Sequence, residues 1–146
     1  MIKVVSAAAL LAAILSTSVL AADGKTLFAN SCALCHQVGG VGAPGLAPPL
    51  ADKALWDRLG EKAPAYIAGV MLAGFSGTIE VAGVTYSGLI MPPQDQMTDE
   101  ELAAIGNYVL ATLNKSGQQV LAPDVAKRRS APLSHAQLRA LRRTGQ

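Results

Sequence analysis

Two cysteines and a histidine lie close together in the segment ANSCALCHQV, residues 29–38. Cys32 and Cys35 are the only cysteines of the chain, and His36 directly follows the second. Such a pair can form a disulfide in an exported protein, or a redox dithiol whose first thiolate attacks a substrate disulfide. The spacing C-x-x-C-H permits a third chemistry, in which both thiols add to the vinyl groups of a haem and the histidine ligates its iron.

The residues on either side of the motif favour the haem. A redox dithiol of the thioredoxin type requires a βαβ pattern around the motif. Here a helical pattern leads into it, with Leu27, Ser31 and Leu34 at steps of four and three residues, and with Asp23 placed to cap the helix. The segment GGVGAPGLAPPL that follows is rich in Gly and Pro and predicts no helix.

A haem iron in an electron carrier also needs a ligand on its second face, commonly His or Met. The best candidate is Met91, because two prolines follow it, so the chain is not helical there and holds the side chain rigidly. Met97, directly before the predicted helix start TDEE, is the second candidate. Met71 lies in the apolar helical segment PAYIAGVMLAG, which favours a place in the core.

The surrounding elements are predicted to be mainly helical. DKALWDRLG, which places the single tryptophan Trp56 on a core-facing helix side, and PAYIAGVMLAG predict two short helices. The clearest helix follows Thr98, which forms a capping-box pattern with Glu101, and it carries an apolar stripe of Leu102, Ile105, Val109 and Leu113. Alternating residues around Ala82 and Gly83 predict a small hairpin near 78–86. We expect an all-α domain over residues 23–114, with about four to five short helices around one haem.

The first 22 residues have the pattern of a secretory signal peptide. Lys3 precedes the apolar run VVSAAALLAAIL, and the segment ends in the small residues of STSVLAA. The alternative is an uncleaved membrane anchor, since the apolar stretch has about the ~20 residues that a bilayer requires. We expect a periplasmic protein, with a membrane-anchored form that faces the periplasm as the alternative.

Charge is unevenly distributed along the chain. Residues 23–122 contain nine acidic and five basic side chains, a net charge of −4, whereas residues 123–146 contain six basic and one acidic, a net charge of +5. We expect residues 115–146 to form a basic C-terminal extension, partly helical, with starts at Pro123 and Ser134, a weak apolar edge at Leu138 and Leu141, and a solvated His135. In an exported protein such an extension favours an acidic protein face or an anionic lipid surface over nucleic acid.

With Cys32, Cys35, His36 and the Met-Pro-Pro at Met91, the sequence resembles a small bacterial class I monohaem cytochrome c over about residues 23–113. The resemblance implies one haem c bound covalently through both cysteines, with His36 and Met91 as the iron ligands.

Further positions match the family pattern. Pro48 and Leu50 in APPL match its Pro-x-Leu, which implies that the Pro48 carbonyl orients His36 and that Leu50 packs on the haem. Gly24, Phe28 and Tyr108 fall where the family has the residues at the crossing of its first and last helices.

An iron with His and Met on its two faces has no open position, so the expected function is one-electron transfer and not catalysis. The stretch GFSGTIEVAGVTYSGLIMPP resembles that of cytochromes that serve dehydrogenases or terminal oxidases. The expected partners are therefore a dehydrogenase or other donor, and an oxidase or other cytochrome as acceptor in a respiratory chain. One alternative is a permanent cytochrome subunit of a periplasmic dehydrogenase complex; another is a five-coordinate haem peroxidase or gas sensor.

Overall fold

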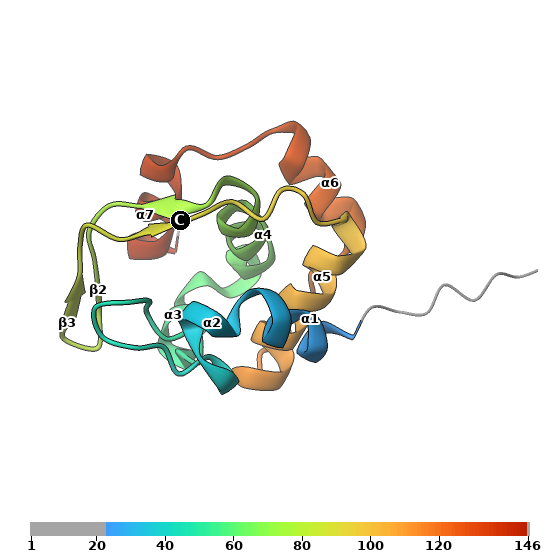
Figure 1. Cartoon of the computed structure of the whole chain (residues 1–146). Coiled ribbons are helices and arrows are strands. Elements are labelled where there is room, and N and C mark those ends of the chain that lie inside the picture. The colour runs from blue at the N-terminus through green and yellow to red at the C-terminus, as the bar shows by residue number, and fades with distance from the viewer. Residues whose placement is uncertain (1–22, 146) are drawn as a thin grey trace, which may run out of the picture.

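The computed structural model describes residues 23–145, so the predicted signal peptide, 1–22, lies outside the described residues. Short helices and two small antiparallel sheets enclose one core (Figure 1). The helical elements are α1 (Gly24–Ser31), α2 (Ala33–His36), η1 (Val38–Gly40), α3 (Lys53–Leu59), η2 (Gly60–Lys62), α4 (Ala63–Ala73), α5 (Asp99–Asn107), η3 (Tyr108–Leu113), α6 (Ala122–Ser130) and α7 (His135–Thr144). The four to five short helices expected for the body correspond to α1 to α5, and the mainly helical fold expected from the sequence is present.

The helix starts follow the predicted caps. The Asp23 carboxylate accepts hydrogen bonds from the backbone N–H groups of Lys25 and Thr26, at 3.1 and 3.3 Å, and begins α1. Thr98 and Glu101 form both hydrogen bonds of the predicted capping box at the start of α5. The α5 helix then continues into η3, a π-helical segment that ends at Leu113.

The first and last helices of the body cross where α1 meets α5 and η3. Gly24 permits the close approach, because a Cβ atom there would overlap the carbonyl oxygen of Ala104. Beside this contact the rings of Phe28 and Tyr108 pack with centroids 5.2 Å apart and planes inclined at 52°. The crossing expected from these three residues is therefore present.

Four short strands make two separate pairs. The predicted hairpin consists of β2 (Ile79–Val81) and β3 (Val84–Tyr86), which pair antiparallel with Ile79 opposite Tyr86. The second pair joins β1 (Phe75–Ser76) to β4 (Ile90–Met91), with Phe75 opposite Met91. The sequence did not predict this second pair, because two-residue strands are too short to show an alternating pattern.

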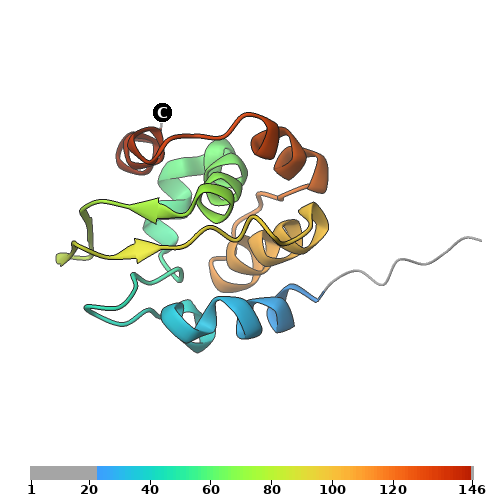
Figure 2. The same cartoon turned by 45° about the horizontal axis from the view of Figure 1, so that its top comes forward.

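The basic extension packs into the same core as the rest of the chain. Helix α6 contacts α4 and α5, and α7 lies beside α3, α4 and β1, as the two views agree (Figure 2). Val125 of α6 and Leu138 of α7 have no exposed surface. The apolar edge expected from Leu138 and Leu141 is therefore a core contact, and it fixes α7 behind the strand β1.

Several charges of the extension are engaged within the molecule. The Arg129 guanidinium donates to Asp99 Oδ1 at 3.0 Å and to the backbone carbonyls of Asp95 and Met97 at 2.7 and 2.8 Å. Arg139 Nη1 donates to the Ser76 carbonyl at 2.6 Å. These contacts stabilise the docked extension and leave less of its charge for a separate partner.

His135 differs from its expected solvated position. It is half-buried at the start of α7, where Nε2 donates to the Ala73 carbonyl at 3.0 Å and Nδ1 lies 2.6 Å from the Ser76 hydroxyl. The packing of α7 against β1, which local sequence does not encode, places the ring between these groups.

No helix within residues 23–145 has the length and apolar character needed to cross a membrane.

Candidate functional site

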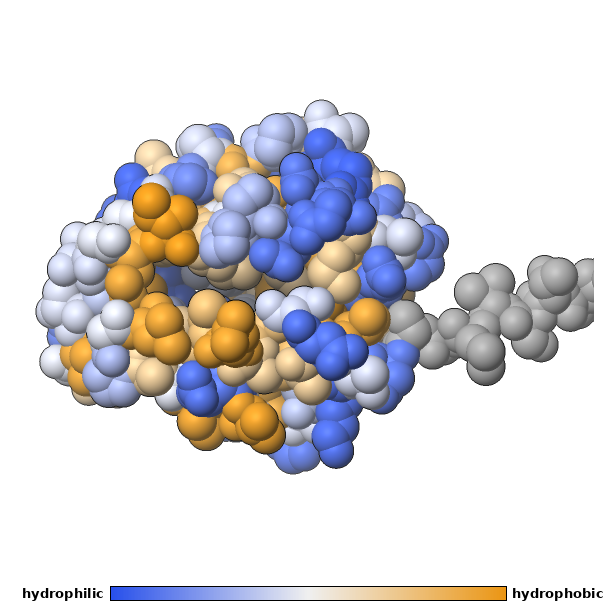
Figure 3. All heavy atoms as spheres, in the orientation of Figure 1, coloured by the Kyte–Doolittle hydropathy of each residue, from blue (hydrophilic) through white to orange (hydrophobic). Residues whose placement is uncertain are grey.

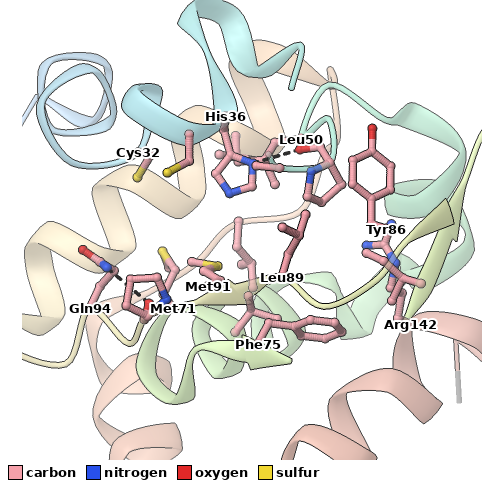
Figure 4. A pocket seen from close by; sticks show the side chains of 18 of the residues that line it. Cys32, His36, Leu50, Met71, Phe75, Tyr86, Leu89, Met91, Gln94 and Arg142 are labelled. Atoms are coloured by element: carbon pink, nitrogen blue, oxygen red, sulfur yellow. Dashed lines mark hydrogen bonds between the residues drawn. The ribbon is translucent and has the colours of Figure 1, made fainter. Parts of the chain in front are cut away.

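A deep, mainly apolar cavity separates α2 and the loop after it from α4 and the β1–β4 pair. Its empty space is about 1250 Å³, including the open mouth, which is ample for a large flat ligand. Cys32, His36 and Leu50 approach it from one side and Met71, Phe75 and Met91 from the other (Figure 4). We call the first side, with Cys35 and Pro48, the histidine wall, and the second side, with Leu89 and Gln94, the methionine wall.

His36 is held in one orientation on the histidine wall. Its Nδ1 donates to the Pro48 carbonyl oxygen at 2.9 Å, which fixes the tautomer and leaves Nε2 directed into the cavity (Figure 4). The ring is only 7% exposed, and this burial lowers the pKa of His36 against the opposing effect of the Pro48 hydrogen bond. His36 therefore offers a neutral nitrogen lone pair to whatever occupies the cavity.

The loop that carries Pro48 is held by backbone hydrogen bonds to the end of the motif. The Gly42 N–H donates to the His36 carbonyl at 2.8 Å, and the Leu50 N–H donates to the Gly40 carbonyl at 2.7 Å. The segment between them thus folds back over His36 and presents Pro48 to the ring.

The cysteines carry free thiols at the edge of the same wall. Burial, with a smaller contribution from the neighbouring Cys35, raises the pKa of Cys32 to about 11. A redox dithiol needs the opposite change, because its attacking sulfur must be a thiolate near neutral pH. The environment of Cys32 thus disfavours thiol–disulfide exchange.

Met91 belongs to β4, and its backbone position is set by neighbours distant in the sequence. Pairing with Phe75 of β1 fixes its register. Gly74 precedes β1 with φ 69° and ψ −169°, a conformation open essentially to glycine alone, and a Cβ atom there would overlap the Met91 carbonyl oxygen. The Gln94 N–H donates to the Met71 carbonyl at 2.7 Å and anchors the chain after the two prolines. The side chain of Met91 is half-buried and lines the cavity opposite His36 (Figure 4).

The other two methionines of the described chain lie in different settings. Met97 packs against the hydrophobic core just before α5 and not against the cavity. Met71 of α4 belongs to the core, as expected, but it also lines the methionine wall beside Met91 (Figure 4). A second sulfur at this wall was not predicted, because the helical pattern around Met71 indicates only that the residue is buried.

Trp56 and Asn114 support the histidine wall through hydrogen bonds to Leu50. The indole Nε1 of Trp56 and the side-chain amide of Asn114 each donate to the Leu50 carbonyl oxygen at 2.8 Å. Trp56 is 2% exposed and packs edge-on against Tyr66, with ring centroids 6.1 Å apart. Trp56 therefore lies in the core, as expected, and its indole N–H is already hydrogen-bonded within the protein.

One cavity residue comes from the C-terminal extension. Arg142 of α7 lines the cavity at the end that also holds Tyr86, away from Cys32 (Figure 4). Sequence reasoning missed it because only the docking of α7 brings residue 142 to the site. The apolar pair Leu138 and Leu141, three residues apart on α7, was the available signal that this helix packs on the body.

The side chains present fit a covalently attached haem. Two thiols and a preoriented imidazole occupy one wall, a thioether faces them, and apolar side chains such as Ile67, Val70 and Phe75 line most of the space between. The apolar lining suits the flat, apolar ring system of a haem, and sulfur and imidazole nitrogen are suitable ligands for its iron.

Comparisons with known proteins agree with this site. The family model described as Cytochrome c matches residues 21–113. Cytochrome c-552 of Thermus thermophilus is 36% identical over 127 residues, which cover 84% of this chain and 95% of that protein. A second cytochrome c-552, from a designated strain of the same species, is also 36% identical over 127 residues, which cover 84% of both chains. The chain therefore belongs to the cytochrome c family, as a class I monohaem c-type cytochrome that carries covalently attached haem c and transfers electrons.

Proposed function

We propose that Cys32 and Cys35 bind the haem through thioether bonds and that His36 Nε2 and the Met91 sulfur ligate its iron from opposite faces. The observation that carries this proposal is the fixed His36 ring, whose Nδ1 is engaged by Pro48 while Nε2 faces the methionine wall. Leu50 packs against the histidine face of the haem. The bound haem supplies an iron that alternates between the ferrous and ferric states.

The chain's own residues keep that iron in one geometry. The thioethers prevent loss of the haem, and the Pro48 hydrogen bond and the β1–β4 pair hold the two ligands against rearrangement. The soft thioether and the apolar lining favour the ferrous state relative to two imidazole ligands in a wetter site. We infer that both oxidation states share nearly one structure, as fast electron transfer requires.

Electrons would enter and leave through an apolar rim around the cavity mouth. Figure 3 shows hydrophobic residues gathered around a hollow on this face. Two exposed side chains of the cavity lining belong to this rim, Leu46 and Ile90, which are 47% and 76% exposed. Leu34, Val38 and Val41, in α2 and directly after it, are exposed as well. An apolar rim suits brief docking of a redox protein near the haem edge, because such contacts need only a small buried area.

We infer that the protein is exported and shuttles single electrons in the periplasm, from a dehydrogenase or other donor to an acceptor such as a terminal oxidase. The pattern of residues 1–22 supports export. Haem attachment through thioethers also suits a protein that works outside the cytoplasm, where a lost cofactor is not replaced.

A redox titration of the mature protein, made in cells that attach haem c, tests this proposal. We expect one haem per chain that resists acid–acetone extraction, low-spin absorption spectra in both oxidation states, and a reversible one-electron curve. A ferrous form that binds carbon monoxide at once would show an open iron, which favours a peroxidase or gas sensor and contradicts the carrier. Quantitative co-purification with a dehydrogenase would instead identify a permanent subunit.

A further inference from the structure

Arg142 places a cation in a cavity whose lining is otherwise almost entirely apolar. Within residues 23–145, it is the only Lys, Arg, Asp or Glu that lines the cavity. It comes from α7, beyond residues 21–113 that the family model matches. A charge in such a place is costly unless an anion or several acceptors compensate it.

The partners of the Arg142 guanidinium within the protein are weak. Nη1 donates to the Tyr66 hydroxyl at 3.3 Å, and Nη2 lies 3.9 Å from Asp52 Oδ2, which is beyond hydrogen-bond distance. The Arg142 side chain is only 11% exposed, and a guanidinium has five N–H donors. Most of these donors make no hydrogen bond to the residues that the structure describes.

Asp52 forms a long ion pair with the guanidinium, but neither partner satisfies its remaining N–H donors. Burial raises the pKa of Tyr66 despite the opposing effect of Arg142, so this phenol stays uncharged near neutral pH. Asp52 uses its other oxygen, Oδ1, to cap α3 by accepting from the Leu55 N–H at 3.1 Å. The site is therefore short of an acceptor on the side that faces the cavity.

Helix α7 holds Arg142 in position. The backbone carbonyl of Arg142 accepts from Arg58 Nε and Nη2 at 3.3 and 3.2 Å, and Leu138, one turn earlier, is fully buried. Arg142 therefore reaches the cavity from a docked helix and not from a loose tail.

A bound haem would offer the missing acceptor. Its two propionate carboxylates lie on the edge of the macrocycle opposite the edge that carries the thioether carbons. Cys32 lies at one end of the cavity and Arg142 at the other (Figure 4). The Trp56 indole N–H, another donor of the cavity lining, is already engaged by the Leu50 carbonyl oxygen. Resting on the proposed haem site, we infer that Arg142 binds a haem propionate and keeps it ionised, so that the C-terminal extension tunes the reduction potential.

Substitution of Arg142 separates this role from mere packing. In Arg142→Gln the propionate loses its cation, and at about pH 8 the ferric–ferrous equilibrium should shift toward ferric iron by about fivefold or more. The potential of this variant should rise as the pH falls, because the propionate becomes protonated, whereas that of the wild type stays flat. Arg143→Gln, which removes the same charge from an exposed position on the same helix, should shift the equilibrium less than about twofold.

Haem attachment is measured first in every variant, so that a failure of the haem site itself is recognised separately. Equal potentials and equal pH profiles for the two glutamine variants would overturn the inference. If Arg142→Gln does not fold, a second measurement tests the inference. Infrared spectra of the wild type and of Arg142→Lys, both labelled with ¹³C in the haem carboxylates, then report the ionisation of each propionate. The inference is supported if one carboxylate stays ionised throughout about pH 5–8 and its infrared band shifts in the lysine variant. Both carboxylates titrating together in that range overturn it.

Discussion

The two walls of the haem cavity are built in different ways. The histidine wall takes all its residues from positions 32–50, and its main hydrogen bond joins residues twelve apart. The methionine wall combines residues of α4, β1 and β4, and α7 packs behind it from more than forty residues away. The first wall is local and covalent, whereas the second depends on the packing of the whole chain. We expect damage to the first to abolish haem binding, and damage to the second to change stability and ligation by degrees.

The largest effect should follow removal of the covalent bonds of the histidine wall. A Cys32→Ser, Cys35→Ser double variant should carry no covalent haem. Because a cavity of about 1250 Å³ would then lack its ligand, its apoprotein should show no cooperative thermal unfolding. Haem staining after denaturing electrophoresis and circular dichroism melts check both points. A cooperative melt of haem-free protein would contradict the dependence of the fold on haem.

Next in size is the loss of the support behind the methionine wall. Leu138→Ala removes a fully buried side chain that docks α7, and the free energy of unfolding should fall by about 2–5 kcal/mol. Denaturant unfolding of the haem-loaded protein measures this. Leu121→Ala, at a position 53% exposed, is the matched control and should cost less than about 1 kcal/mol. Equal costs would mean that α7 is not part of the core in solution.

A smaller effect should come from the backbone contact that positions Met91. Gly74→Ala forces a Cβ atom against the Met91 carbonyl, whereas Gly88→Ala, at a similar φ of 71°, meets no atom within 4 Å. Both glycines have a positive φ, so each variant bears a backbone cost of about 1–3 kcal/mol. Only Gly74→Ala should also reduce the intensity of the long-wavelength absorption band that ferric haem shows when methionine is its ligand. The same loss of this band in both variants would remove the Gly74 contact from the account.

The smallest effect should come from the cap of α1, the helix that leads into the histidine wall. The Thr26 hydroxyl and then the Lys25 N–H bond to the Asp23 carboxylate and lower its pKa below 3.8. The stabilisation is therefore present above that pH and is lost as the pH falls through the lowered folded-state pKa. Asp23→Ala should lower the melting temperature slightly at pH 7 and not at pH 2, while Asp23→Asn, a neutral cap, should abolish this pH dependence. A gap between Asp23→Ala and wild type that does not change with pH would contradict the capping role.

The same contrast explains what the sequence predicted. Cys32, Cys35 and His36 lie within five residues, so their spacing was enough to predict a shared site. The role of Pro48, which accepts from His36 Nδ1, was expected from the family resemblance and not from spacing. The caps at Asp23, Thr98 and Ser134 were equally visible, because capping depends on a few neighbouring residues.

The rest depends on contacts between distant segments. The β1–β4 pair has two residues on each side, and the burial of Leu138 and His135 follows from how α7 docks. Arg142 and the second sulfur, Met71, therefore became visible as cavity residues only in the folded chain.

The absorption spectrum of the ferric and ferrous protein, compared between Met91→Ala and Met71→Leu, tests the central claim most directly. Both sulfurs line the methionine wall, so the pair distinguishes the iron ligand from its neighbour. The account predicts that Met91→Ala loses the long-wavelength ferric band and opens the iron to carbon monoxide, while Met71→Leu keeps a wild-type spectrum. A band that survives in Met91→Ala and disappears in Met71→Leu would contradict it.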